Sequence, residues 1–337
     1  MTPTGTVLSK YDEASRLLSV ASPLVTLKQF TYGTTGSDAG KLKESSAFNY
    51  RMGSSCSSTE VRQDYTYDPT TGWLASEATS LWQGAAPLEA WNQAYAYDGA
   101  GRITAVTYPS CTSLCTSPSR LVTTSYSYGR PISVSGFASL ITYNDNGTPL
   151  AVMHPNNVVF TETLDPNGMV RPGSLRADGP GNTTPWPQEA YFYDTAGNIK
   201  AIGAKSFAYD ADSRVVSATV PTAGAQPYEA FTYDAYGNLA TAFRGANPGS
   251  GTTIQYQVDA SNHLTSARYD NSGEVTNYPI VQGTAYTWDV LGQLTSMNTG
   301  IELWTYLYDA AGERVWSYRT APSRLDNYAL RARMASC

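Results

Sequence analysis

The sequence is short of charged residues, cysteine and histidine, and it contains no long hydrophobic run. Only 15% of the 337 residues are charged, with a formal net charge of -6 and no cluster of Lys and Arg. This excludes the basic surface expected of a protein that binds nucleic acid or an anionic membrane. No stretch is apolar for long enough to cross a bilayer, and the N-terminal residues MTPTGTVLSKYD lack the pattern of a signal peptide. We therefore expect neither a nucleic-acid partner nor a membrane span.

Cysteine is too scarce and too scattered to build a metal site. Cys56, Cys111, Cys115 and Cys337 all lie in loop-like sequence. A bridge from Cys111 to Cys115 and free surface thiols are both compatible with this spacing. One close pair without a histidine nearby does not support a zinc site.

The remaining reactive side chains do not form an enzyme pattern. His154 lies in VMHPNN without a neighbouring nucleophile, and His263 occupies the polar position of a repeat described below. Most carboxylates recur at one position of that repeat, where a role in a turn explains them better than paired acid and base catalysis does. No glycine-rich nucleotide loop occurs. We expect no catalytic residue, no cofactor and no metal, and we predict that the protein is not an enzyme.

What the sequence does contain is tyrosine, glycine and proline in a repeating arrangement. The 25 Tyr, 28 Gly and 19 Pro predict many short strands separated by turns. The repeat is an aromatic residue, Asp, two variable residues, Gly, a polar residue and an aliphatic residue. About twelve copies start at Tyr11, Tyr67, Tyr97, Tyr143, Leu164, Tyr193, Tyr209, Tyr233, Val258, Tyr269, Trp288 and Tyr308.

Each conserved position of the repeat has a physical role in a tight turn. The second residue can accept hydrogen bonds from backbone N–H groups two or three residues on. It is Asp in all copies but one, namely Asp12, Asp68, Asp98, Asn144, Asp165, Asp194, Asp210, Asp234, Asp259, Asp270, Asp289 and Asp309. These residues, with the glycines that follow, are the structural turn sites that we predict.

The fifth residue is expected to adopt a positive φ, which glycine does most readily. Glycine occupies it as Gly72, Gly101, Gly147, Gly168, Gly197, Gly237, Gly273, Gly292 and Gly312. Ser15, Ser213 and Asn262 are the exceptions, and of these Asn tolerates the conformation best.

A second aromatic residue usually stands two positions before the leading one, as in Tyr65 with Tyr67 and Tyr191 with Tyr193. This spacing places both rings on one face of a strand. The unit is therefore a β-hairpin, and we expect its rings to pack between neighbouring hairpins. The pairs Phe30 with Tyr32, Phe48 with Tyr50 and Tyr126 with Tyr128 lack the full turn, so they are either degenerate copies or partner strands.

The distances between copies vary, which predicts constant hairpins joined by variable loops. We expect long loops in GTTGSDAGKLKESSA after Tyr32, PSCTSLCTSPSR after Tyr108, RADGPGNTTPWPQ after Leu175 and GANPGSG after Arg244. The prediction is an all-β array over residues 1–315 in one continuous curved or spiralling antiparallel sheet, followed by a tail at 316–337. Trp82, Trp91 and Trp186 are assigned to variable loops as candidate contact rings.

The strings YDGAGRI, YDTAGNI, YDAYGNL and YDAAGERV, each with an upstream aromatic, resemble the YD-repeat or Rhs family. The resemblance extends from about Tyr11 to Val315. It implies hairpins joined into a ribbon that forms part of a hollow shell, as in the related toxin-complex cocoons and teneurins. Its expected role is to enclose a toxic polypeptide of a bacterial toxin for secretion or delivery.

Complete members of that family end in a segment of DPxxGRF type, which marks the boundary with the toxin. After Val315 the chain reads WSYRTAPSRLDNYALRARMASC, without that segment. The partners implied are the rest of a larger Rhs-type polypeptide and its toxin cargo, in a secreted or cell-surface setting. Self-association through unpaired sheet edges is a further expectation. The alternative is an adhesion module that binds carbohydrate or a protein surface.

Overall fold

The computed structural model describes residues 6–50, 58–109, 119–221, 224–278, 284–321, 323 and 325–328, and this part of the chain is almost entirely β. Its only helical elements are two short 3-10 turns, η1 (Gly36–Asp38) and η2 (Pro180–Asn182). None of the helices described is long and apolar enough to cross a membrane. The predicted all-β class is confirmed.

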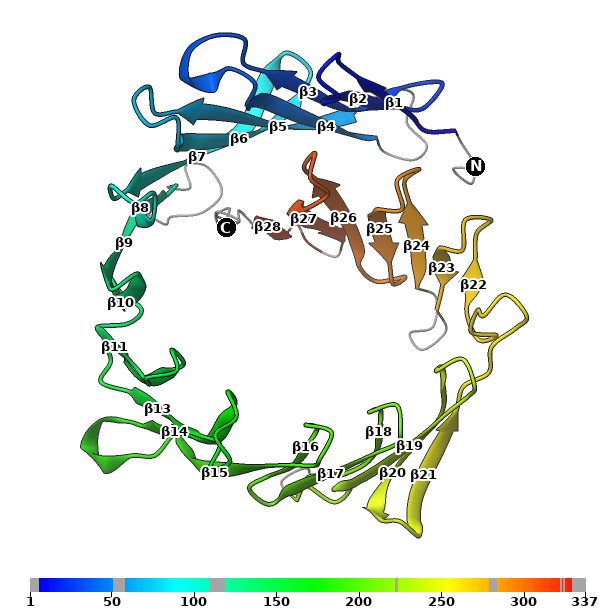
Figure 1. Ribbon diagram of the computed structural model, residues 1–337. Coiled ribbons are helices and arrows are strands. Elements are labelled where there is room, and N and C mark those ends of the chain that lie inside the picture. The colour runs from blue at the N-terminus through cyan, green and yellow to red at the C-terminus, as the bar shows by residue number, and fades with distance from the viewer. Residues whose placement is uncertain are drawn as a thin grey trace. The chain divides into compact units, whose positions relative to one another are not determined.

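The strands form three antiparallel sheets, and within each sheet every strand is hydrogen-bonded to its neighbours in the chain (Figure 1). The first sheet contains β1 (Leu8–Tyr11), β2 (Leu17–Ala21), β3 (Thr26–Tyr32), β4 (Leu42–Tyr50), β5 (Ser58–Tyr67), β6 (Leu74–Gln83), β7 (Ala86–Tyr97), β8 (Ile103–Tyr108), β9 (Arg120–Ser127) and β10 (Arg130–Val134). The second contains β11 (Leu140–Tyr143), β12 (Pro149–Met153), β13 (Val159–Leu164), β14 (Pro172–Asp178), β15 (Trp186–Tyr193), β16 (Ile199–Ile202), β17 (Lys205–Tyr209), β18 (Val215–Thr219), β19 (Tyr228–Tyr233), β20 (Leu239–Asn247) and β21 (Ser250–Gln255). The third contains β22 (Arg268–Tyr269), β23 (Val275–Asn277), β24 (Ala285–Trp288), β25 (Leu294–Asn298), β26 (Leu303–Tyr308), β27 (Arg314–Ala321) and β28 (Leu325–Tyr328). Tandem hairpins are confirmed, and they are divided among three successive sheets.

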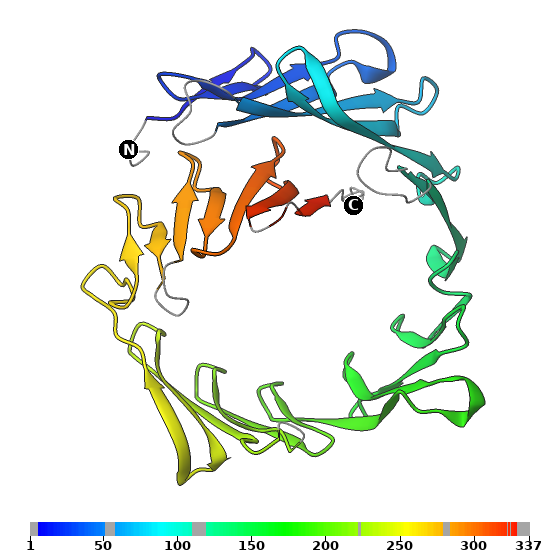
Figure 2. The same ribbon diagram turned by 180° about the vertical axis from the view of Figure 1, so that it is seen from behind.

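The chain divides into two compact units. The first unit combines residues 1–122 with 266–337, and the second is Thr123–Thr265. In the first unit, strand β26 contacts β4 and β5, so that segments from the two ends of the sequence lie against each other (Figures 1 and 2). The buried cluster between them consists of Val61, Leu81, Trp91, Leu307, Val315, Trp316 and Tyr318.

Alternation along the strands explains which side chains of the first unit are buried. On β5, Thr59, Val61, Gln63 and Tyr65 are buried, while the residues between them are more exposed. The buried face is partly polar, because the Gln63 amide donates to Glu77 Oε1 at 2.8 Å and the Ser45 hydroxyl donates to Gln63 Oε1 at 3.3 Å. Hydrogen bonding of this kind offsets the cost of removing amide and carboxylate groups from water.

Three of the predicted long loops are wrong in part, because strands occupy them, and the fourth, PSCTSLCTSPSR after Tyr108, lies largely outside the described residues. In RADGPGNTTPWPQ, β14 continues to Asp178 and β15 starts at Trp186. In KLKESSA, strand β4 starts at Leu42, so only the first half of the segment after Tyr32 is a loop. In GANPGSG, β20 continues to Asn247 and β21 starts at Ser250, which makes a tight hairpin tip. The paired Gly245 and Gly251 permit it, since a Cβ on Gly251 would lie 2.2 Å from the Arg244 carbonyl oxygen. Small residues therefore extend strands here instead of ending them.

Strand pairing also continues after residue 315. Strand β27 pairs with both β26 and β28, with Trp316 opposite Tyr328 and Arg319 opposite Leu325. Trp316 and Tyr318 contribute to the buried cluster of the first unit. The residues after Val315 thus include a strand that helps to hold that unit together.

Candidate functional site

The repeating turn is the most regular feature of the molecule. In most copies the N–H of the second residue donates to the carbonyl of the sixth, and the N–H of the fifth donates back to the second, as in Asp12 N–H to the Arg16 carbonyl and Ser15 N–H to the Asp12 carbonyl, both at 3.0 Å. Asp68 and Asp165 donate instead to the carbonyls of Trp73 and Arg171. The Asp12 carboxylate then accepts from the N–H groups of Ala14 and Arg16 at 2.9 Å. The carboxylate therefore accepts from the backbone N–H groups two and four residues on, whereas the sequence predicts donors two or three residues on. Only Asp68, whose turn has an extra residue, bonds two and three positions on, to Thr70 and Thr71.

All of the predicted fifth positions have a positive φ. The glycines range from 71° at Gly72 to 92° at Gly147, and Ser15, Ser213 and Asn262 have φ of 61°, 59° and 64°. The same conformation is found at Asn157, in a turn where His154 takes the place of the aspartate. The turn therefore requires a positive φ at its fifth position, although the residue there need not be glycine.

The turn holds its carboxylates in the charged form. For Asp12 and Asp210, backbone N–H donation from Arg16 and Arg214 lowers the pKa below its usual value, helped by the guanidinium groups of the same residues. For Asp98 the side chain of Arg102 is the largest cause, with Nε donating to Oδ2 at 2.7 Å. Asp289 is the opposite case, since burial raises its pKa.

A basic residue of one turn also covers the leading ring of the next hairpin. The guanidinium of Arg16 lies 4.6 Å from the ring centroid of Tyr32, that of Arg171 3.8 Å from Tyr193, and that of Arg214 4.7 Å from Tyr233. Trp73 takes this position against Tyr97, with ring centroids 5.3 Å apart. Each of these arginines thus connects the carboxylate of its own turn with the aromatic ring of the following repeat through a cation–π contact, and Trp73 supplies a ring contact.

The leading rings complete the connection with a hydrogen bond that the sequence analysis missed. Each phenol donates to the carbonyl at the start of the return strand in the preceding hairpin, for example Tyr233 to Val215 and Tyr209 to Ile199, both at 2.8 Å. The other donors of this set are Tyr32, Tyr50, Tyr67, Tyr97, Tyr143, Tyr193 and Tyr308, with the indole of Trp288 acting likewise. We call this bond the ring-to-carbonyl bond. Tyr32 and Tyr50 make it too, so their ring pairs share this contact with the copies of the repeat.

In the first unit, two polar side chains join the N-terminal strands to a C-terminal turn. Asn49 donates through Nδ2 to the Tyr308 carbonyl at 3.0 Å, and its Oδ1 accepts from the Tyr308 N–H at 2.9 Å. Lys28 donates to the Ala310 carbonyl at 3.0 Å. Neither residue belongs to a repeat motif, so no sequence signal marked them.

The other residues singled out from the sequence lie apart from one another. His154 bonds through Nδ1 to the Phe137 carbonyl oxygen at 2.7 Å, and the His263 N–H donates to Asp259 Oδ1 at 2.9 Å. The loop assignment of the tryptophans is wrong: Trp82 and Trp91 lie within β6 and β7, and Trp91 is only 5% exposed. Trp186 starts β15 and is 50% exposed.

Cys56, Cys111, Cys115 and Cys337 lie outside the described residues. Within the described ranges, no group of three or more His, Cys, Asp or Glu side chains is placed to hold a metal ion. The repeated turn and its ring-to-carbonyl bond are therefore taken as the candidate site.

Comparison with known proteins agrees with this geometry. The teneurin YD-shell family model matches residues 193–324. This segment is similar to the teneurin YD-shell. The YD-repeat resemblance inferred from the sequence is thereby confirmed, and the matched segment contains the turns of Asp194, Asp210, Asp234 and Asp309.

The YD-shell fold extends beyond the matched segment. The crystal structure of TcdB2-TccC3 aligns with 97% of this chain and 21% of its own at 15% identity, with a TM-score of 0.69. The Photorhabdus luminescens Tc holotoxin pore, with a mutation in TccC3, aligns with 96% of this chain and 20% of its own at 15% identity and a TM-score of 0.65. The chain thus spans about a fifth of the length of these structures. No curated protein matches it by sequence.

Proposed function

We propose that this chain is a wall segment of a hollow protein shell that encloses a toxic polypeptide before its delivery. The YD-shell match over residues 193–324 carries the proposal, and the fold likeness to Tc toxin structures over 97% of the chain supports it. On this proposal the chain acts within a larger secreted or contact-delivered toxin polypeptide. Its task is enclosure, without catalytic turnover.

The repeat suits a wall because its strength comes from contacts between neighbours. The turn, the basic side chain and the ring-to-carbonyl bond recur from hairpin to hairpin, so that a ribbon can be lengthened without a new core at each step. Such a ribbon can cover a large area with few side chains of special chemistry. The scarcity of charge keeps its sheet faces suitable for packing.

Protection from protease is the direct test. The natural polypeptide that contains this chain would be purified whole and digested with a protease of broad specificity. We expect the enclosed segment to survive while exposed linkers are cut, and to be degraded once the shell is unfolded in denaturant. Mass spectrometry of the surviving fragments provides the readout.

The matched control is the same cargo segment expressed alone, which should be digested rapidly. A double variant, Tyr209→Phe with Tyr233→Phe, removes two ring-to-carbonyl bonds and should shorten the period of protection. Equal digestion of the cargo within the whole polypeptide and alone would refute enclosure.

A further inference from the structure

Strand β21 is an open edge of the second sheet. It is the last of eleven strands and pairs with β20 through six residue positions, Thr241 with Gln255 to Asn247 with Ser250. All six residues of β21 are exposed, and Ile254 is 56% exposed. A strand at the end of a sheet presents a row of backbone N–H and C=O groups to any chain that can pair with it.

Among the strands that end the described sheets, β21 is the one long strand without edge protection. Natural edges are blocked by charge or proline, and these occur as Lys10 in β1, Arg130 and Pro131 in β10, Arg268 in β22, and Asp326 in β28. The four-residue β11 is also uncharged, but the Tyr143 phenol at its end bonds to the Pro131 carbonyl of the preceding hairpin at 2.6 Å. The sequence SGTTIQ of β21 contains neither charge nor proline.

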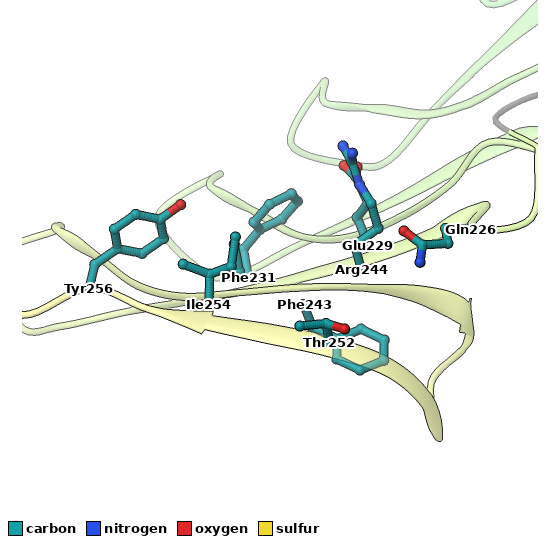
Figure 3. Close-up of a pocket in the computed structure, with 9 residues that line it drawn as sticks. Gln226, Glu229, Phe231, Phe243, Arg244, Thr252, Ile254 and Tyr256 are labelled. Carbon is teal, nitrogen blue, oxygen red and sulfur yellow. The ribbon is translucent and has the colours of Figure 1, made fainter. Parts of the chain in front are cut away.

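A groove of about 380 Å³ lies on the sheet across β19, β20 and β21, and so reaches this edge (Figure 3). The strand register places Phe231 opposite Ala242 and Ala242 opposite Ile254, so that one apolar row crosses the three strands. Tyr256 lies at one end of the row. At the other end Arg244 Nε donates to Glu229 Oε1 at 2.7 Å, which leaves the groove without net charge.

We infer that the β21 edge binds an extended, uncharged polypeptide segment as an additional antiparallel strand. The edge supplies the backbone hydrogen bonds, and it continues the pairing that already links every strand of this sheet. Because side chains of a strand alternate, every second residue of the segment lies on the same sheet face as Phe231, Ala242 and Ile254, next to Ile254, and is apolar. A charged residue there loses water without gaining an ionic partner, since Glu229 and Arg244 already pair.

The test uses the full chain and a synthetic peptide of alternating Val and Thr, six residues long like β21, with a fluorescent label and a solubilising lysine tail. We expect saturable binding by fluorescence anisotropy, with slower amide hydrogen exchange confined to residues 250–255. Ile254→Lys places a charge in the groove and should weaken binding at least about ten-fold. Leu24→Lys, at a position 93% exposed in the turn between β2 and β3, is the matched control and should bind as the unchanged protein does.

Three results would overturn the inference, and two of them need no protein variant. A peptide N-methylated at alternate amides cannot pair along the edge, so its binding with equal affinity would assign recognition to the groove alone. Absence of saturable binding at any concentration at which the peptide stays soluble would exclude the site. Concentration-dependent self-association that Ile254→Lys abolishes, without peptide binding, would place a second copy of the chain at this edge.

Discussion

At the scale of single residues, the fifth turn position combines a fixed backbone with a variable side chain. A left-handed conformation costs an ordinary L-residue about 1 to 2 kcal/mol, and glycine avoids this cost. Ser15 and Ser213 nevertheless hold φ of 61° and 59°. The hydrogen bonds that close the turn therefore outweigh the local preference of these two residues.

Gly168→Ala isolates this backbone effect. Gly168 has φ of 77°, and an added Cβ would meet no atom within 4 Å, so steric contact does not contribute. We expect the free energy of unfolding to fall by about 1 kcal/mol. Gly99→Ala is the control, because its Cβ also meets nothing within 4 Å while its φ is not positive. Urea titration of both variants measures the difference, and equal stabilities would contradict the role assigned to φ.

The ring-to-carbonyl bond makes a second prediction at this scale. Tyr233→Phe keeps the ring under Arg214 and removes only the donor to the Val215 carbonyl. We expect a loss of about 1 kcal/mol in unfolding free energy, typical of one partly buried hydrogen bond. Tyr236→Phe, on a side chain that is 89% exposed, should change nothing measurable. A loss of the same size in both variants would show that the bond is unimportant.

At the scale of the hairpin, the turn and the contact between repeats depend on the same side chains. Arg214 donates through Nε to Asp210 Oδ2 at 2.8 Å and also lies over the ring of Tyr233. The charge of Asp210 thus orients the group that covers the next repeat. Protonation of the turn carboxylates should loosen individual turns and the joints between hairpins together.

This coupling predicts sensitivity to acid. The pKa values of Asp12, Asp98 and Asp210 are lowered from 3.8 in the folded chain. Their contribution to stability is therefore complete above that value and is lost as the pH falls through the lower folded pKa values. Burial raises the pKa of Asp289, so its protonation acts in the opposite direction. Because the pKa of the carboxylate is lowered in several turns, we expect the urea midpoint of unfolding to fall steadily below about pH 4.

Asp210→Asn provides the control for this prediction. An amide oxygen can accept hydrogen bonds from the same backbone N–H groups, but it has no carboxylate to protonate. We expect lower stability at neutral pH and a shallower decrease in acid. If the acid slope is the same with and without this carboxylate, Asp210 is not one of the groups responsible.

At the scale of the whole molecule, the sequence predicts the local unit far better than the way distant segments combine. The Asp–Gly pattern marks the turns because each is closed within seven residues or so. Nothing comparable marks Asn49, whose partner Tyr308 is 259 positions away. Trp91 was assigned to a loop although it is buried on β7, since burial there depends on a sheet from the other end of the chain. Contacts between segments that are far apart in the sequence do not recur at a fixed spacing, so no sequence pattern predicts them.

Leu307→Ala tests whether this long-range packing is a separate cooperative element. Leu307 is 4% exposed and belongs to the buried cluster that includes Val61 and Leu81 from the first sheet. Its truncation should leave a cavity and lower the stability of the first unit by about 2 to 5 kcal/mol. Hydrogen exchange should then accelerate in β4, β5 and β6, while β17 to β19 of the second unit keep their protection. Uniform acceleration in both units would mean that the chain unfolds as one cooperative body, and the division into two units would then have no energetic meaning.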